Sequence, residues 1–238
     1  MIHNSIIIIS LAKWRNYISV RRFNLDNYYP FLVLMLVVIV PQPQIRLFQN
    51  RWLERLTVIS AQNFMVLWVA GLPFIAVQAW GTADAGIATL LVTVGVLTWT
   101  LSEYALHRFV FHWDPASATL KKIVFIMHGN HHHVPNDPLR NLMPPIISLP
   151  VGGLIWAAML ALVGLAGSWL FLGFMGGYVV YDLVHYGCHQ WPMKGRLARL
   201  LKTHHMHHHH RHEIGNFAIT GMMWDRLFHT RIAQKAHV

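Results

Sequence analysis

Histidine is the residue type whose number and spacing in this sequence point most directly to chemistry. The chain has 18 histidines, and all except His3 and His237 lie between His107 and His229. Most of them fall into four clusters, which read HRFVFH, HGNHH, HYGCH and HMHHH. The clusters contain ten candidate metal ligands: His107, His112, His128, His131, His132, His185, His189, His205, His208 and His209. So many imidazoles in clusters predict a metal site, because imidazole suits Zn, Cu and Fe.

The spacing within the clusters matches one face of a helix. In HxxHH and HxxxH the histidines are three or four residues apart and share a face, and the last two of HxxHH point about 100° apart. Adjacent histidines can therefore reach two different metals. The two histidines of HxxxxH are about 140° apart on a regular helix, so we expect a helix end or a π-type distortion near Phe111. Ten candidates exceed one tetrahedral site, whereas two metals with about four to six ligands each would use them.

The elements that must position these clusters are apolar helices. Apolar residues make up 55% of the chain and charged residues only 12%, against about 25% charged residues in soluble domains. Four segments are long and apolar enough to cross a bilayer: 64–80, 87–106, 146–165 and 169–184. Short glycine-containing links join the first two and the last two. We therefore predict an all-α integral membrane protein with two transmembrane hairpins, that is four crossings, and a helical histidine cap that holds a di-metal site.

The distribution of basic residues predicts the orientation. No Lys or Arg occurs between Arg55 and Arg108 or between Arg140 and Lys194, so both hairpin tips lack positive charge. The positive-inside rule then assigns the histidine cap to the cytosolic side. The net charge of +10 fits an anionic membrane surface. Nucleic acid is not expected as a partner, because long apolar runs separate the basic residues. The single cysteine, Cys188, excludes an internal disulfide framework and fits a reducing compartment.

The N-terminal part of the chain is harder to assign. We treat residues 1–60 as an interfacial or unassigned segment and residues 61–238 as the membrane-embedded domain. The apolar run 6–12 is followed by charged and aromatic residues rather than a cleavage site, so no signal peptide is predicted. The run 31–40 lies between two prolines and is too short to cross, so we expect it in the interface or against the bundle.

The all-histidine clusters favour oxygen chemistry. A hydrolytic zinc site needs about three protein ligands, an open position and a nearby carboxylate base. Because lipid tails contain no hydrolysable bond, a metal pair at the membrane edge is interpreted as an O₂-activating centre that acts on a tail. The acids Glu103, Asp137 and Asp182 are candidates to orient ligand imidazoles through their ring N–H groups. No residue beyond the metal ligands is assigned a catalytic role.

The last cluster lies in a run in which six of the seven residues 204–210 are histidines. Relative to His205, His208 and His209 lie about 60° behind and 40° ahead on a helix. His207 points about 160° away from His205 and is expected to face away from the metals.

Together these motifs resemble the fatty acid hydroxylase and sterol desaturase superfamily, and within it the fatty acid 2-hydroxylase branch. The resemblance is carried by EYALHRFVFH, HGNHHHVPND, a Pro-Pro pair, YDLVHYGCH, KTHHMHHHHRHEIGNFAIT and WDRLFHT, which span residues 103–230 in the family's order. It implies a multi-pass fatty acid hydroxylase, a monooxygenase of the endoplasmic reticulum or a bacterial inner membrane. It also implies that the ten histidines bind two iron ions, with O₂ as co-substrate and a fatty acyl lipid as substrate. Zinc can replace iron at imidazole sites in purified samples.

Eukaryotic members of this branch often carry a fused cytochrome b5 domain, whose His-Pro-Gly-Gly motif is not found before residue 64. We therefore expect a separate electron donor, either cytochrome b5-like or ferredoxin-like with a reductase. The spacing leaves open a desaturase or an oxidase of sterols or other lipids, which would use the same ligands. A His-rich metal transporter or sensor is a different class. That class predicts polar residues inside the crossings, and segments 64–80 and 146–165 have almost none.

Overall fold

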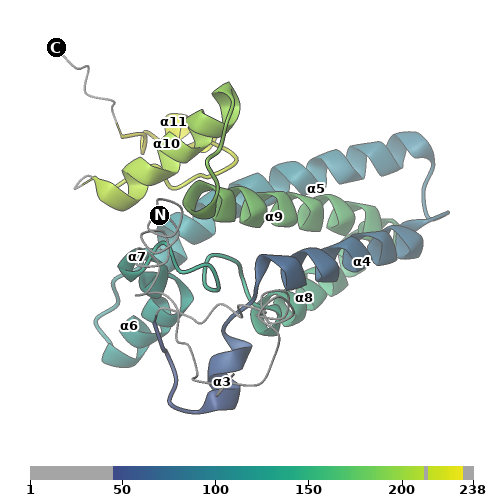
Figure 1. Ribbon diagram of the computed structural model, residues 1–238. Coiled ribbons are helices and arrows are strands. Elements are labelled where there is room, and N and C mark those ends of the chain that lie inside the picture. Colours follow the sequence, from purple (N-terminus) through teal and green to yellow (C-terminus); the bar gives the residue numbers. More distant parts are fainter. Residues whose placement is uncertain (1–44, 212–213, 233–238) are drawn as a thin grey trace, which may run out of the picture. The chain divides into compact units, whose positions relative to one another are not determined.

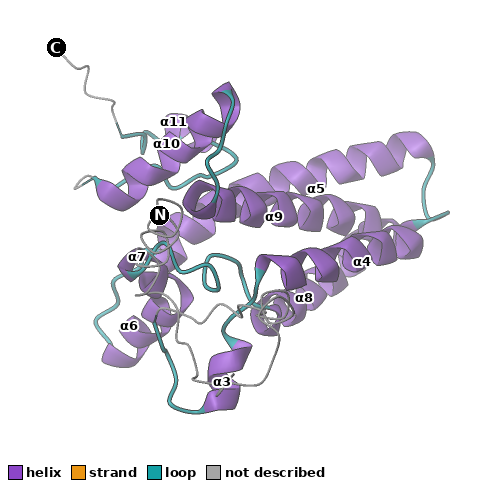
Figure 2. Cartoon of the chain, in the orientation of Figure 1, coloured by secondary structure: helices purple, strands orange, loops and turns teal. Residues whose placement is uncertain are grey.

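The computed structural model describes residues 45–211 and 214–232, which belong to one compact unit covering residues 41–238 (Figure 1). Every regular element in this part of the chain is a helix, as Figure 2 shows. The predicted all-α class is therefore confirmed for these residues. The run 31–40 lies outside them, and the predicted boundary after residue 60 stays a prediction.

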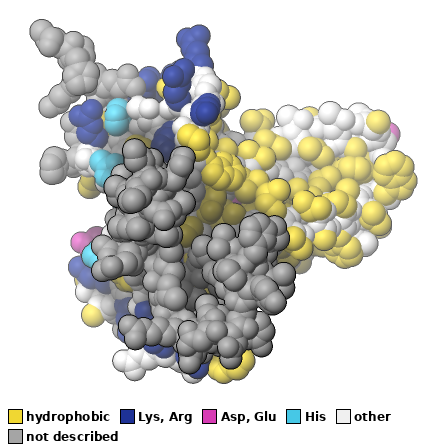
Figure 3. Space-filling view, in the orientation of Figure 1, with side chains coloured by type: hydrophobic (Ala, Val, Ile, Leu, Met, Phe, Trp, Pro, Cys, Tyr) yellow, Lys and Arg dark blue, Asp and Glu magenta, His cyan; other side chains and the backbone are white. Residues whose placement is uncertain are grey.

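Three stretches of helix are long and apolar enough to cross a membrane. They are α4 (Ala61–Ala79), the stretch Ala85–Phe111 made of α5 (Ala85–Leu106) and the π-helix η1 (His107–Phe111), and the stretch Pro145–Gln190. The third stretch contains α8 (Pro145–Val163), a short 3-10 helix η3 (Gly164–Ala166) and α9 (Gly167–Gln190). Their surfaces expose large apolar side chains, and Figure 3 shows hydrophobic side chains over much of this bundle.

The links between these helices fall where the sequence predicts them. Gly81 adopts φ 75° after α4, and Asp84 begins α5 by accepting hydrogen bonds from the backbone N–H groups of Gly86 and Ile87 at 2.8 and 3.0 Å. Gly164 adopts φ 68° at the end of α8, a left-handed conformation that glycine adopts without steric cost. The chain reverses there, and α8 packs against α9.

Helix α9 is the centre of the bundle, because α4, α5 and α8 all pack against it. Its contact with α5 depends on glycines that face the other helix's backbone. A Cβ atom at Gly95 would collide with the backbone of Leu170, and one at Gly173 would collide with the backbone of Val92. Small residues at such a crossing let two membrane helices approach closely. The carboxyl-terminal turns of α9 and the π-helix that follows α5 are thereby held together.

The remaining helices surround this end of the bundle. Helix α6 (Ala118–Val124), the π-helix η2 (Phe125–Gly129) and α7 (Asn130–His133) lie between α5 and α8 in the chain, and α10 (Arg196–His210) and α11 (Met223–Leu227) follow α9. Helix α3 (Arg51–Leu56) precedes α4 and is tied to the loop before α8 by an ion pair between Glu54 and Arg140. Lys and Arg side chains gather around α10 in Figure 3, away from the apolar bundle.

Candidate metal centre

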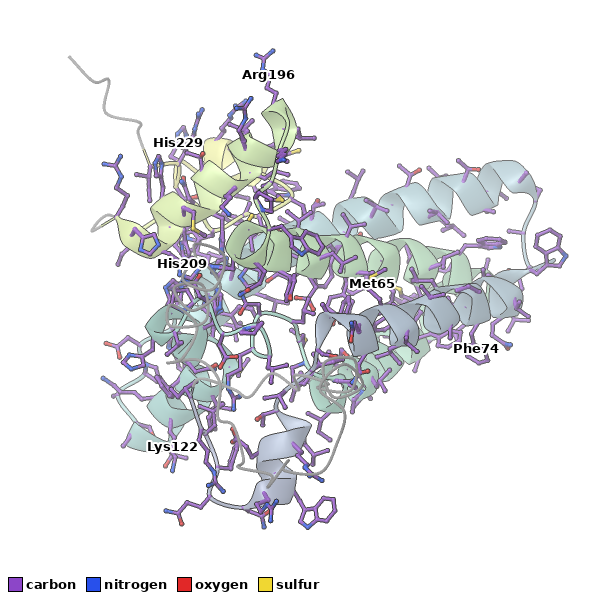
Figure 4. The ribbon with its side chains drawn as sticks, viewed as in Figure 1. Met65, Phe74, Lys122, Arg196, His209 and His229 are labelled. Atoms are coloured by element: carbon purple, nitrogen blue, oxygen red, sulfur yellow. The ribbon has the colours of Figure 1, made fainter. Side chains whose placement is uncertain are left out.

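The ten candidate ligands come together in two groups of five. The first group contains His107, His112, His128, His132 and His208. The second group contains His131, His185, His189, His205 and His209. Within each group, one ring nitrogen from every residue lies within 4.8 Å of all the others. Figure 4 shows His209 on the side of α10 that faces α7.

Adjacent histidines on α7 and α10 belong to different groups. His132 belongs to the first group and His131 to the second, and the same division separates His208 from His209. The Nε2 atoms of His132 and His208 are 3.1 Å apart, and those of His131 and His209 are also 3.1 Å apart. Helices α7 and α10 therefore face each other and contribute to both groups. This division is expected, because consecutive residues on a helix point about 100° apart.

Of the two alternatives expected near Phe111, a helix end or a π-type distortion, the structure has a π-helix. The π-helix η1 (His107–Phe111) begins at the first histidine of HRFVFH, and the ring centroids of His107 and His112 are 5.0 Å apart. On a regular helix these side chains would diverge by about 140°. The wider π turn brings the two imidazoles into one group, in agreement with the frequent occurrence of π-helices at functional sites.

A second π-helix was not predicted from the sequence. It is η2 (Phe125–Gly129), and the side-chain amide of Asn130 donates to the carbonyls of Phe125 and Ile126 at 3.0 and 2.7 Å. This distortion precedes α7 and places the Nε2 atom of His128 3.0 Å from that of His132. The first histidine of the HGNHH cluster, His128, therefore lies in the π-helix η2, and the other two lie on α7.

Backbone carbonyls set the protonation of three ligand candidates. Each of these three imidazoles donates a hydrogen bond from Nδ1 to a backbone carbonyl oxygen. His107 donates to the carbonyl of Phe217, His185 to that of Asn141 and His208 to that of Gly215. Because a carbonyl oxygen can only accept, the proton must sit on Nδ1 in all three rings. The lone pair on Nε2 then faces the other imidazoles of the group, which is the tautomer that a metal ion requires.

The electrostatics also favour neutral imidazoles. Burial, followed by the neighbouring imidazole of His208, lowers the pKa of His112 to about 4. Burial and the nearby imidazoles lower the pKa of His132 to about 3 and hold the pKa of His205 well below its ordinary value. Neutral rings whose lone pairs converge at about 3 Å repel one another unless a cation lies between them. The two groups therefore fit a pair of bound metal ions.

The three acids predicted to orient imidazoles are buried and accept hydrogen bonds from backbone N–H groups. Glu103 accepts from Ile219 and Thr220, Asp182 from Met143, and Asp137 from Leu139. Glu103 thus holds the loop that contains the carbonyl of Phe217. Asp182 holds the loop that contains the carbonyl of Asn141. The role of the three acids in orienting the imidazoles stays a prediction, and for Glu103 and Asp182 it would act through the backbone of these loops.

The sequence analysis missed one buried acid, Asp225, although it lies inside the WDRLFHT motif. Asp225 is fully buried and accepts hydrogen bonds from two backbone N–H groups of the segment 214–220. Its carboxylate also lies 3.0 Å from Nε2 of His204. His207 belongs to neither group, and it lines a small cavity with Leu200 and Arg226.

The fold and the site define a class of protein, in which helices that are long and apolar enough to span a membrane carry two groups of histidines. The family model described as fatty acid hydroxylase matches residues 92–230. The chain is 33% identical to the fatty acid 2-hydroxylase of Macaca fascicularis in an alignment that covers 82% of this chain and 58% of that protein. It is 33% identical to the dihydroceramide fatty acyl 2-hydroxylase FAH1 of Arabidopsis thaliana, with coverages of 80% and 81%.

A solved structure of full-length scs7p, in which only the hydroxylase domain is visible, has a TM-score of 0.72 and 33% sequence identity. The match covers 79% of this chain and 72% of that chain. The chain therefore belongs to the fatty acid hydroxylase family, and the resemblance seen in its motifs is confirmed. It spans a little under three fifths of the length of the macaque relative.

Proposed function

We propose that this protein is a di-iron, O₂-dependent lipid hydroxylase that places a hydroxyl group on carbon 2 of a fatty acyl chain. The observation that carries the proposal is the convergence of ten imidazoles into two groups of five beside an apolar helical bundle. The relatives named as 2-hydroxylases support the acyl substrate and the position of the new hydroxyl group.

The donor set supports iron and redox chemistry. Imidazole ligands suit Fe, Cu and Zn, and a hydrolytic zinc site would need a free carboxylate as base. The buried carboxylates of Glu103, Asp182 and Asp225 instead accept hydrogen bonds from backbone N–H groups. When bound, an iron pair would supply the activation of O₂ for attack on a C–H bond.

The overall reaction determines how many electrons and protons must be supplied to the protein. One C–H bond and one O₂ molecule give one C–OH group and one water, and the balance requires two electrons and two protons. We propose that a separate carrier delivers the electrons, either cytochrome b5-like or ferredoxin-like with a reductase. The protein's own residues hold the Nε2 lone pairs in place, through the carbonyls of Phe217, Asn141 and Gly215.

We propose that the bundle crosses the membrane four times. The stretch Pro145–Gln190 has 46 residues, and at about 1.5 Å per residue it would be more than twice as long as a hydrocarbon core of about 30 Å. The reversal at Gly164 and the packing of α8 against α9 support two crossings in this stretch. The histidine groups would then lie on the cytosolic side of a bacterial inner membrane or the endoplasmic reticulum, because the basic residues surround them.

Lipid mass spectrometry tests the function. A host that lacks 2-hydroxylated lipids is given the intact chain, the His185→Ala variant or the His207→Ala variant. His185 belongs to the second group and His207 to neither group. We expect acyl chains that are heavier by one oxygen atom, with fragments that locate it on carbon 2, for the intact chain and His207→Ala only. A new double bond would identify a desaturase, and oxidation of a sterol or another lipid would identify a different oxidase. Metal uptake without any change in lipids would favour a transporter or sensor.

A further inference from the structure

The two histidine groups differ in how their imidazoles are held. In the first group, two rings donate to carbonyls of one segment, His208 to Gly215 at 2.7 Å and His107 to Phe217. We call residues 214–220 the strap. In the second group, His185 donates to the carbonyl of Asn141 at 3.0 Å, far from the strap in the sequence. The strap therefore serves the first group.

The side chain of Phe217 shows the same preference. Its ring centroid lies 5.9 Å from that of His107, 5.6 Å from that of His112 and 5.8 Å from that of His208. All three imidazoles belong to the first group. A shift of Phe217 would therefore move a carbonyl acceptor and a packing surface of the same group.

The strap has no helical hydrogen bonds of its own, and buried side chains hold it in place. Asp225 accepts from the backbone N–H groups of Phe217 and Ala218, each at 2.9 Å. The same carboxylate accepts from the hydroxyl of Thr230 at 2.7 Å and lies 3.0 Å from Nε2 of His204 on α10. One carboxylate thus ties the strap to the helix that carries His208.

We infer that Asp225 is a positioning residue that prepares the first histidine group and not the second. The inference rests on the proposed metal centre. Its basis is that the two oxygens of Asp225 accept hydrogen bonds from four donors. Two of these donors are backbone N–H groups, which can only donate and cannot act as acceptors. In Asp225→Asn, one oxygen becomes an NH₂ donor. The hydroxyl of Thr230 or the ring of His204 can reorient, but the N–H group of Phe217 or Ala218 then faces another donor. The strap must shift, and with it the acceptors for His107 and His208.

A Co²⁺ titration of the purified protein, followed by visible absorption, tests this inference without measuring activity. Two background variants each weaken one group: His189→Ala removes a ligand of the second group, and His112→Ala removes a ligand of the first. The tighter Co²⁺ transition then reports the group that keeps all five imidazoles. In the His189→Ala background, Asp225→Asn is expected to weaken Co²⁺ binding by about 10- to 100-fold, the usual effect of losing a partner that orients a ligand. In the His112→Ala background, it should change the affinity by less than about twofold.

A matched control is Asp182→Asn, which alters another buried carboxylate that accepts a backbone N–H bond, from Met143 at 2.9 Å. It should leave Co²⁺ affinity unchanged in the His189→Ala background. If Asp225→Asn does not give folded protein, Thr230→Val removes one donor to the same carboxylate and should weaken the first group several-fold. Equal loss in both backgrounds, or no loss in either, would overturn the inference while leaving the metal centre intact. Failure of the unaltered protein to bind Co²⁺ would instead overturn the proposed metal centre and the inference with it.

Discussion

The crowded histidine run on α10 gives the sharpest comparison, between His205→Ala and His207→Ala. His205 is fully buried, and its Nε2 atom lies 2.8 Å from that of His189 and 3.0 Å from that of His209. Loss of an orienting partner costs about 10- to 100-fold in metal affinity, so loss of the imidazole itself should cost more than about 100-fold. His207 is only half-buried and belongs to neither group.

These affinities convert into stability. A 100-fold loss of affinity removes up to about 2.7 kcal/mol of the stabilisation that saturating metal provides. At about 2 to 4 °C per kcal/mol for a chain of this size, His205→Ala should lower the thermal midpoint of the metal-loaded protein by roughly 5 to 10 °C. His207→Ala should change stability by less than about 0.5 kcal/mol, because His207 is partly exposed and a substitution away from the core and the metal ligands usually has a small effect.

The assay combines metal content per chain, thermal midpoint in detergent and hydroxylated lipid product. His208→Ala serves as a second comparison, because His208 belongs to the first group. The single variants at His205 and His208 should each lose about one metal ion, and the double variant should lose both. The double variant at His205 and His209 should lose no more metal than either single variant. Loss of metal in His207→Ala with full retention in His205→Ala would refute the assignment of this helix.

Four further outcomes are expected. A cysteine in place of Asp84, in the tip between α4 and α5, should react with an impermeant label only from the side opposite the cytosol, and labelling from the cytosolic side alone would contradict the orientation. Product formation should stop without O₂ or reductant, and oxygen from labelled O₂ should appear in the new hydroxyl group. Gly173→Ala should destabilise the protein by about 1–3 kcal/mol, because its Cβ would collide with the backbone of Val92, whereas Gly176→Ala, with open space around it, should be neutral. Metal should be lost as the pH falls toward the pKa of about 4 of His112. The metal-free fold should lose stability as the pH falls below 6.5, because the unfolded chain takes up protons that the buried imidazole excludes.

Local geometry allowed part of this site to be predicted from the sequence. The divergence of adjacent histidines depends only on the helix repeat, so the separation of His131 from His132 follows from the HxxHH spacing. The five-residue spacing of His107 and His112 conflicts with that repeat. The conflict indicated a helix end or a π-type distortion, and the structure has the π-helix η1. The hairpin links were marked by glycines, two of which adopt positive φ in the structure, at 81 and 164.

Contacts between distant parts of the chain could not be predicted in this way. The π-helix η2 depends on the side chain of Asn130, and the HGNHH spacing is compatible with a regular helix. The acceptor for the ring N–H of His107 lies 110 residues further on, in a segment without regular structure. Asp225 was missed for the same reason: an acid in a short helix has no pattern that reveals its burial or its backbone partners.

The assignment of neighbouring histidines to different groups has a consequence for the spacing of the site. Because His131 and His132 are consecutive, their Cα atoms are held about 3.8 Å apart by covalent geometry. The same holds for His208 and His209 on the opposite helix, and the rings of His132 and His209 stack across the boundary with centroids 4.3 Å apart. The two groups are therefore joined twice by the backbone and cannot separate while α7 and α10 stay helical. A substitution that loosens the strap can weaken the ligands of the first group, but the distance between the groups is set by the two helices.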